Sequence, residues 1–207
     1  FPFIRPDGDG TFYCISDLFN MYRLSSTREL VYEKGINKNN QAAIYGGLRY
    51  DMQYEELISN VKQFPPKLFY SSRNKEHTRK AEEGIIYLPG TKNEADKILS
   101  IIDDADFIRL HAKAYLGKTG TETSFKELSN TNQRLIHVAS HGYFYSEDDA
   151  DFDFLELGDH PMNRSGLLFA GADNKWFGEM IPKEIDDGFL TALEISNLDF
   201  RNLELIV

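Results

Sequence analysis

An α/β fold with a mostly parallel central sheet between two layers of helices, a three-layer αβα arrangement, is the fold class that the sequence predicts. Two observations indicate it: short apolar runs recur along the chain, and segments with helical apolar spacing lie between them. The chain has 207 residues, of which 41% are hydrophobic and 27% charged. These values are typical of a globular protein with a sizeable buried core.

Helices are expected where apolar residues recur every three or four positions. Residues 51–62 carry such a stripe. The next helix is expected to open with a T-x-x-E capping box, in which Thr91 and Glu94 each bond the main chain of the other residue. Ser124 and Glu127 predict a second capping box, which would begin a short helix.

Strands are expected where aliphatic and β-branched residues form short runs bounded by turn residues. Such runs occupy residues 84–88, 107–115, 135–139, 166–170 and 203–207. The run at 135–139 is predicted to be a central strand. Residues 143–165 are expected to form a loop with an acidic, solvated insertion, and a short helix is expected around residues 190–196.

The charge and cysteine content narrow the classes of partner. The net charge of −10 gives no basic field that would collect phosphates, so nucleic acid is not an expected partner. No segment approaches the ~20 apolar residues of a membrane span, and the first residues are not a secretory signal. The single cysteine, Cys14, forms no internal disulfide, and no zinc-type spacing occurs. A cytoplasmic protein with neither metal nor cofactor is therefore expected.

His141 is the first candidate for chemistry. Ser140, His141 and Gly142 directly follow the predicted central strand, and α/β proteins place their chemistry at the carboxyl ends of such strands. A histidine at this edge can take and return a proton near neutral pH, which suits a general base. Gly142 has no side chain, so its N–H can approach a substrate carbonyl closely, as an oxyanion donor must.

Several blocks of sequence, in this order, resemble the CHAT domain family, whose members are caspase-like peptidase modules often joined to tetratricopeptide repeats. The blocks are YRLSSTREL at residues 22–30, YGGL at 45–48, LPGTKNEA at 88–95, IHVASHGYF at 136–144, RSGLLFAGA at 164–172 and DGFLTALEISNL at 187–198. They span most of the chain, and together they are more specific than any single block.

The resemblance implies a fold and a mechanism. The family pattern H-x-A-[TS]-H-G maps onto His137 and His141, and the second histidine is the catalytic one. The family's cysteine nucleophile follows a strand resembling residues 203–207, so it would fall about four residues beyond Val207. Residues 1–207 are accordingly expected to be a single, incomplete caspase-like CHAT domain that ends before the nucleophile and is inactive alone.

In the complete domain the resemblance implies a Cys–His dyad that cleaves protein or peptide substrates. The N–H groups of Gly142 and of the cysteine would hold the oxyanion. The expected partners are the substrate and a regulatory repeat module or partner protein. The residues that bind the substrate, and the residue preferred at the cleavage site, stay open. The alternative is a non-catalytic interaction domain that keeps the fold and has lost the nucleophile.

Other interpretations of the same residues are weaker. Cys14 lies far in sequence from the strand that should present a nucleophile, so a packing role is favoured for it. His137 and His141 have the spacing H-x-x-x-H, which on a helix would suggest zinc, but in a strand the two side chains lie about 13 Å apart. His137 is interpreted as a buried core histidine, with orientation of the dyad as the alternative role.

The block at residues 164–172 also has two interpretations. The favoured one is a buried strand entered through a tight turn. In the other, Arg164 or Ser165 lines a substrate groove.

Overall fold

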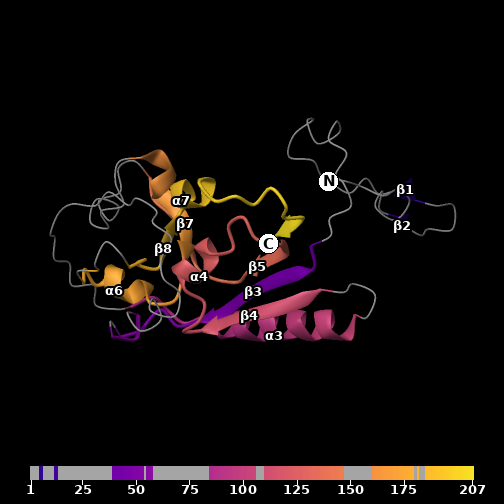
Figure 1. Ribbon diagram of the computed structural model, residues 1–207, viewed down its shortest axis with the longest axis horizontal. Coiled ribbons are helices and arrows are strands. Elements are labelled where there is room, and N and C mark those ends of the chain that lie inside the picture. The colour runs from indigo at the N-terminus through magenta and orange to yellow at the C-terminus, as the bar shows by residue number, and fades with distance from the viewer. Residues whose placement is uncertain are drawn as a thin grey trace. The chain divides into compact units, whose positions relative to one another are not determined.

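The computed structural model describes residues 5–6, 12–13, 39–53, 55–57, 84–105, 110–146, 160–179, 181 and 185–207. The chain divides into two compact units, Phe1–Asn37 and Lys38–Val207. In the first unit, strand β1 (Arg5–Pro6) pairs antiparallel with β2 (Phe12–Tyr13). The second unit contains every other described element (Figure 1).

A four-stranded parallel sheet forms the centre of the second unit (Figure 1). Its strand order is β4-β3-β5-β9, with bounds β3 Gln41–Leu48, β4 His111–Gly117, β5 Gln133–Val138 and β9 Leu205–Ile206. β3 lies between β4 and β5 and is buried from Ala42 to Leu48. The predicted α/β class with a parallel central sheet is confirmed, as is the central position of the run at 135–139.

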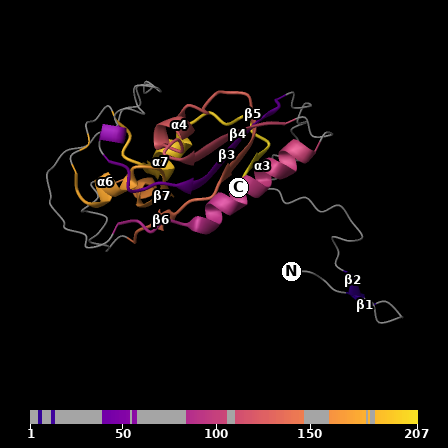
Figure 2. The ribbon, with the colours of Figure 1, turned by 90° about the horizontal axis from the view of Figure 1, so that it is seen from below.

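Alternate residues of β3 face two different layers, as the period of two along a strand requires. Ala42 and Ile44 pack against Ala95 and Ile102 of helix α3, Pro89–Asp104. Figure 2 shows α3 lying along this face of the sheet. Gly46 lies on the same face, where a Cβ would overlap the carbonyl oxygen of Thr91, so only glycine lets the helix approach this closely.

An aromatic cluster covers the opposite face. The Tyr45 ring stacks on Tyr115, with ring centroids 4.5 Å apart. Phe125 and Phe169 contact the Tyr45 ring edge-on, at 5.8 Å and 5.7 Å between centroids. Phe125 comes from the short helix α4, Glu122–Lys126, and Phe169 follows strand β7 of a second sheet. The core therefore joins the parallel sheet to this second sheet.

The second sheet is antiparallel and has the order β6-β7-β8, with bounds β6 Gly142–Phe144, β7 Ser165–Leu168 and β8 Phe189–Thr191. The run at 166–170 does contain a strand, but this strand does not join the parallel sheet. The loop prediction for residues 143–165 is wrong at its start and end, where β6 and the 3₁₀ helix η2 (Pro161–Arg164) lie. The acidic stretch at 147–159 lies outside the described residues.

The helix starts differ from the predicted capping boxes. α3 begins at Pro89, because proline suits the first helical turn, so Thr91 already lies inside the helix. The Thr91 hydroxyl donates instead to the Leu88 carbonyl and accepts from the Gly47 N–H at 2.9 Å. For α4 the cap is Thr121, whose hydroxyl accepts from the Ser124 N–H at 3.1 Å, so the predicted box at Ser124 and Glu127 is also wrong.

The capping box that the structure does contain begins α7, Ala192–Ser196, where Thr191 and Glu194 bond each other's main chain. The predicted helix around 190–196 therefore starts two residues late, because Phe189–Thr191 forms β8. A further short helix, α6, spans Ala172–Trp176. Of the predicted helix at 51–62, residues 51–53 are described and are not helical, so the prediction is wrong at its start. Residues 55–57 are helical, and residues 54 and 58–62 lie outside the described residues.

Two of the remaining strand predictions hold within the described residues. β4 begins at His111, with residues 106–109 not described, and β9 confirms the run at 203–207. The prediction of a buried strand at 84–88 is wrong. Residues 84–88 form no strand and pair with none of the described strands, and Ile86 and Tyr87 are 71% and 45% exposed. Among the described helices, none combines the length and hydrophobicity needed to cross a bilayer.

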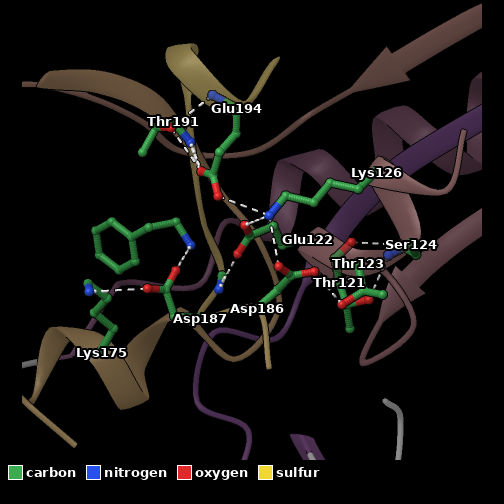
Figure 3. A network of polar contacts seen from close by, with 12 residues as sticks. Thr121, Glu122, Thr123, Ser124, Lys126, Lys175, Asp186, Asp187, Thr191 and Glu194 are labelled. Carbon is green, nitrogen blue, oxygen red and sulfur yellow. Dashed lines mark hydrogen bonds and ion pairs between the residues drawn. The ribbon is translucent and has the colours of Figure 1, made fainter. Parts of the chain in front are cut away.

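A buried charge network, which we call the Lys126 network, connects α4 to the β8–α7 region (Figure 3). Lys126 Nζ lies 2.6 Å from Glu122, 2.8 Å from Asp186 and 3.0 Å from Glu194. The second carboxylate oxygen of Glu122 accepts from the Gly188 N–H at 2.8 Å. Removing these charges from water is costly, and their mutual attraction offsets that cost only while all partners are in place.

Burial, together with the nearby Asp186 and Glu194 carboxylates, raises the pKa of Glu122 to about 7, against the opposing effect of Lys126. The folded-state pKa is therefore higher than the ordinary value of 4.5. The contribution of Glu122 to stability is fully present below the unfolded-state pKa and is lost as the pH rises through the folded-state value.

Glu122→Gln should therefore remove this pH dependence. The free energy of unfolding of the variant minus that of the unchanged protein is expected to increase by about 1–3 kcal/mol as the pH rises from 5 to 8. Urea unfolding at four pH values measures it, and Glu204→Gln, an exposed carboxylate paired with Arg134, is the control. If this difference decreased as the pH rises, the result would contradict this account of Glu122.

Candidate active site

His141 lies at the carboxyl edge of the parallel sheet, three residues after the end of β5. It is half-buried. β9 runs parallel beside β5, with Leu135 opposite Leu205 and Ile136 opposite Ile206. The Val138 N–H donates to the Val207 carbonyl at 2.8 Å. Because parallel strands end at the same edge, β9 leads toward the edge that carries His141.

The imidazole of His141 has a defined partner. Its Nε2 lies 2.7 Å from the carbonyl oxygen of Ile86. A carbonyl oxygen only accepts hydrogen bonds, so Nε2 must carry the proton that is donated. In the neutral ring this leaves Nδ1 as the basic nitrogen. The bond therefore selects the tautomer in which Nδ1 can take up a proton.

Tyr50, which follows β3, holds the main chain at His141. Its hydroxyl accepts from the His141 N–H at 3.4 Å and lies 2.9 Å from Ser140 Oγ. Ser140 gives its own proton to the Leu168 carbonyl, so Tyr50 must donate to Ser140. The Leu168 N–H in turn donates to the His141 carbonyl at 2.9 Å. These bonds attach residues 140–141 to both sheets.

The Tyr50 ring also contacts the imidazole, with ring centroids 5.3 Å apart and planes inclined at 52°. Tyr50 is 3% exposed. Burial raises the pKa of its phenol, although the hydrogen bonds with Ser140 and the His141 main chain oppose the shift. The hydroxyl therefore stays protonated at neutral pH, as its donation to Ser140 requires.

Gly142 is the first residue of β6, at the outer edge of the antiparallel sheet. The flanking residues make the bonds to β7: Leu168 donates to His141, and Tyr145 donates to Arg164. Since the bonding direction alternates along an antiparallel strand, the Gly142 N–H points away from β7. An added Cβ at Gly142 would have nothing closer than 3.5 Å, so no crowding by the described residues requires glycine here.

His137 lies on the face of the parallel sheet that α3 covers. It lies opposite Ile44 in the strand register, on the α3 side, and is 8% exposed. Its Nε2 lies 3.2 Å from the Glu94 carboxylate. His137 and His141 therefore contact different partners on different parts of the fold. Within the described part of the chain, no three His, Cys, Asp or Glu side chains come together as metal ligands.

The block at residues 164–172 forms the strand β7 and the turn into α6. Arg164 Nη1 donates to the Ser146 carbonyl at 2.7 Å, and Ser165 lies opposite Phe144 in the β6–β7 ladder. Leu168, Phe169 and Ala170 are buried, as the interpretation as a buried strand expects. A role for Arg164 or Ser165 in substrate binding stays a prediction. Cys14 lies outside the described residues.

Sequence analysis did not identify Ile86 or Tyr50 as part of the site. Ile86 contributes a carbonyl oxygen, which every residue has, so its side chain gives no signal. Its place in an exposed apolar run was the only cue, and that run was interpreted as a strand. Tyr50 lies two residues after β3, at the edge where site residues gather, and this position was a usable signal.

The described fold is thus an α/β fold with a parallel central sheet, and His141 and Gly142 follow its inner strand β5 at the carboxyl edge. The CHAT domain model matches residues 24–207. The chain belongs to the CHAT domain family, which is caspase-like and related to peptidases, and the predicted family and fold class are confirmed. Comparison with curated proteins gives no match, and neither does comparison with solved structures.

Tyr50→Phe tests the hydrogen bonds around His141. The variant keeps the ring but leaves the His141 N–H without its acceptor, so the free energy of unfolding should fall by about 1–2 kcal/mol. Urea unfolding measures the loss. Tyr115→Phe is the control, because Tyr115 is also buried and no described residue bonds its hydroxyl. Equal losses in both variants would show that the Tyr50 hydroxyl has no special role.

Proposed function

We propose that this chain is the histidine-bearing part of a cysteine endopeptidase domain. In this proposal His141 is the proton carrier, and the nucleophilic cysteine is supplied by polypeptide that follows β9. One observation carries the proposal: the bond from Nε2 to Ile86 leaves a basic Nδ1 at the edge toward which β9 leads. The family membership, which is peptidase-related, supports the same class of reaction.

The chemistry begins with proton transfer from the cysteine thiol to Nδ1 of His141. The thiolate then attacks the scissile carbonyl carbon, and the electron pair of the C=O bond moves onto the oxygen. When the tetrahedral intermediate collapses, the C–N bond breaks and the amine leaves with the proton from Nδ1. A water molecule, deprotonated by His141, hydrolyses the remaining thioester and frees the thiol.

Ile86 has a defined part in this cycle. Its carbonyl accepts from Nε2 in the neutral ring and continues to do so when the ring is an imidazolium. A hydrogen bond from a charged donor is the stronger of the two. The contact therefore stabilises the protonated ring that forms during the reaction, while it holds the ring in a fixed orientation.

Gly142 is proposed as an oxyanion donor. Its N–H points away from β7, and no described residue crowds its α-carbon, so a substrate carbonyl could approach it closely. The cysteine's own N–H would be the second donor. Each such donor contributes on the order of 3 kcal/mol to the transition state.

The proposed partners are a protein or peptide substrate and a regulatory repeat module or partner protein, and the proposed location is the cytoplasm. The competing proposal is a non-catalytic interaction domain of the same fold. The two differ in one residue: a cysteine shortly after β9 supports the peptidase, and another residue in its place supports the interaction domain.

The peptidase proposal is tested with a protein extended beyond Val207 to include the segment in which the cysteine is expected. Fluorogenic peptides ending in Arg, Lys or Asp report turnover. His141→Ala should lower kcat/KM about 10²- to 10⁴-fold, the typical contribution of a general acid–base. The control is His111→Ala, an exposed side chain at the start of β4.

Two results would overturn this assignment. A His141→Ala variant with unchanged turnover would remove His141 from the mechanism. A protein with a cysteine after β9 that cleaves none of the peptides, and no protein substrate in a proteome-wide digest, would favour the interaction domain.

A further inference from the structure

Asp173, in the short helix α6, bonds Ile85, the neighbour of the residue whose carbonyl accepts from the His141 imidazole. The side chain is 7% exposed. Its Oδ1 accepts from the Ile85 N–H at 2.7 Å. The next residue, Ile86, presents the carbonyl that accepts from His141 Nε2 at 2.7 Å. The buried carboxylate is thus connected to the imidazole by two hydrogen bonds and the main chain between the Ile85 N–H and the Ile86 carbonyl.

A second path leads from the same residue to the same histidine. The Asp173 N–H donates to the Tyr50 carbonyl at 3.1 Å. The Tyr50 hydroxyl accepts from the His141 N–H, and its ring contacts the imidazole. Asp173 therefore bonds both of the segments that hold His141, one through its side chain and the other through its main chain.

The main chain of residues 84–87 makes few polar contacts, although the Ile85 side chain packs against the core. It belongs to no strand, and Ile86 and Tyr87 are exposed. Among the described residues, the hydrogen bonds to its main chain come from Asp173 and His141. Without the carboxylate, the Ile86 carbonyl would be held by the packing of the Ile85 side chain against the core and by the bond to the histidine that it orients.

The fit between the carboxylate and this segment is close. A Cβ added to Gly84 would lie 2.6 Å from Asp173 Oδ2 and 3.1 Å from Cγ. The main chain at Gly84 therefore lies directly against the carboxylate, and any side chain there would push the two apart. Burying a carboxylate is costly, so a buried one is expected to have specific partners, as it has here.

We propose that Asp173 is a positioning residue for His141, which fixes the orientation of the imidazole through the main chain of Ile85 and Ile86. The effect on turnover rests on the proposed function, since it needs His141 as the proton carrier. The effect on the orientation of the imidazole does not, and it can be measured in the 207-residue chain itself.

The experiment follows the Nε2 proton of His141 by nitrogen-15 NMR. In the unchanged protein this proton should be observable and the ring should be in the Nε2–H form. Asp173→Ala should speed exchange of the proton with water at least about tenfold, because the Ile86 carbonyl no longer holds its place. Asp173→Asn should restore slow exchange, because the amide oxygen can still accept from the Ile85 N–H.

Two further variants separate positioning from general destabilisation. Gly84→Ala pushes the main chain of residue 84 away from the Asp173 carboxylate and should also speed the exchange. This variant keeps the test available if Asp173→Ala does not fold. Thr121→Ala removes a buried acceptor of a main-chain N–H in α4, away from these contacts, and should leave the exchange unchanged. Folded Asp173→Ala and Gly84→Ala proteins that both keep slow exchange would overturn the proposal.

The kinetic consequence is measured in the longer, cysteine-bearing protein. Asp173→Ala should lower kcat about 10- to 100-fold with KM changed less than about twofold, the pattern of a misplaced catalytic group. If the variants change proton exchange in a protein without peptidase activity, the positioning role stands and the proposed function fails. If the peptidase is active and neither exchange nor kcat responds, the positioning role fails alone.

Discussion

The hydrogen bond between His141 Nε2 and the Ile86 carbonyl is the constraint on which the site depends. It decides which ring nitrogen is basic, and it joins a segment before α3 to a segment after β5. Neither segment is regular secondary structure at the point of contact, so neighbouring groups must hold both. Tyr50 does this on the histidine side, and Asp173 does it on the Ile86 side.

The fold provides these supports by joining two sheets. The parallel sheet brings the ends of β3 and β5 together, and the antiparallel sheet adds β7, which bonds residues 140–141 from the other side. The aromatic cluster around Tyr45 fills the space between them. The Lys126 network adds polar contacts between α4 and the β8–α7 region, at the cost of burying one ammonium and several carboxylates.

The parts predicted from sequence are those that local pattern determines. β5 was found because a strand buried on both faces is apolar along its length, and α3 because its apolar residues recur at helical spacing. Helix starts were harder to predict, because T-x-x-E occurs both inside α3 and at the true cap of α7. His141 and Gly142 were placed by their position after a strand. Ile86 and Asp173 act through main-chain groups of distant segments, which no spacing along the chain reveals.

The passage from β5 to β6 is three residues long, and it carries the chain from one sheet directly into the other. His141 is the last residue of that passage, and its main chain is bonded by Leu168 of β7 and by Tyr50, which follows β3. If one sheet rotated against the other, the change in direction would fall on residues 139–141, and the His141 imidazole would move with them. The position of the imidazole therefore depends on how the parallel and antiparallel sheets are oriented relative to each other.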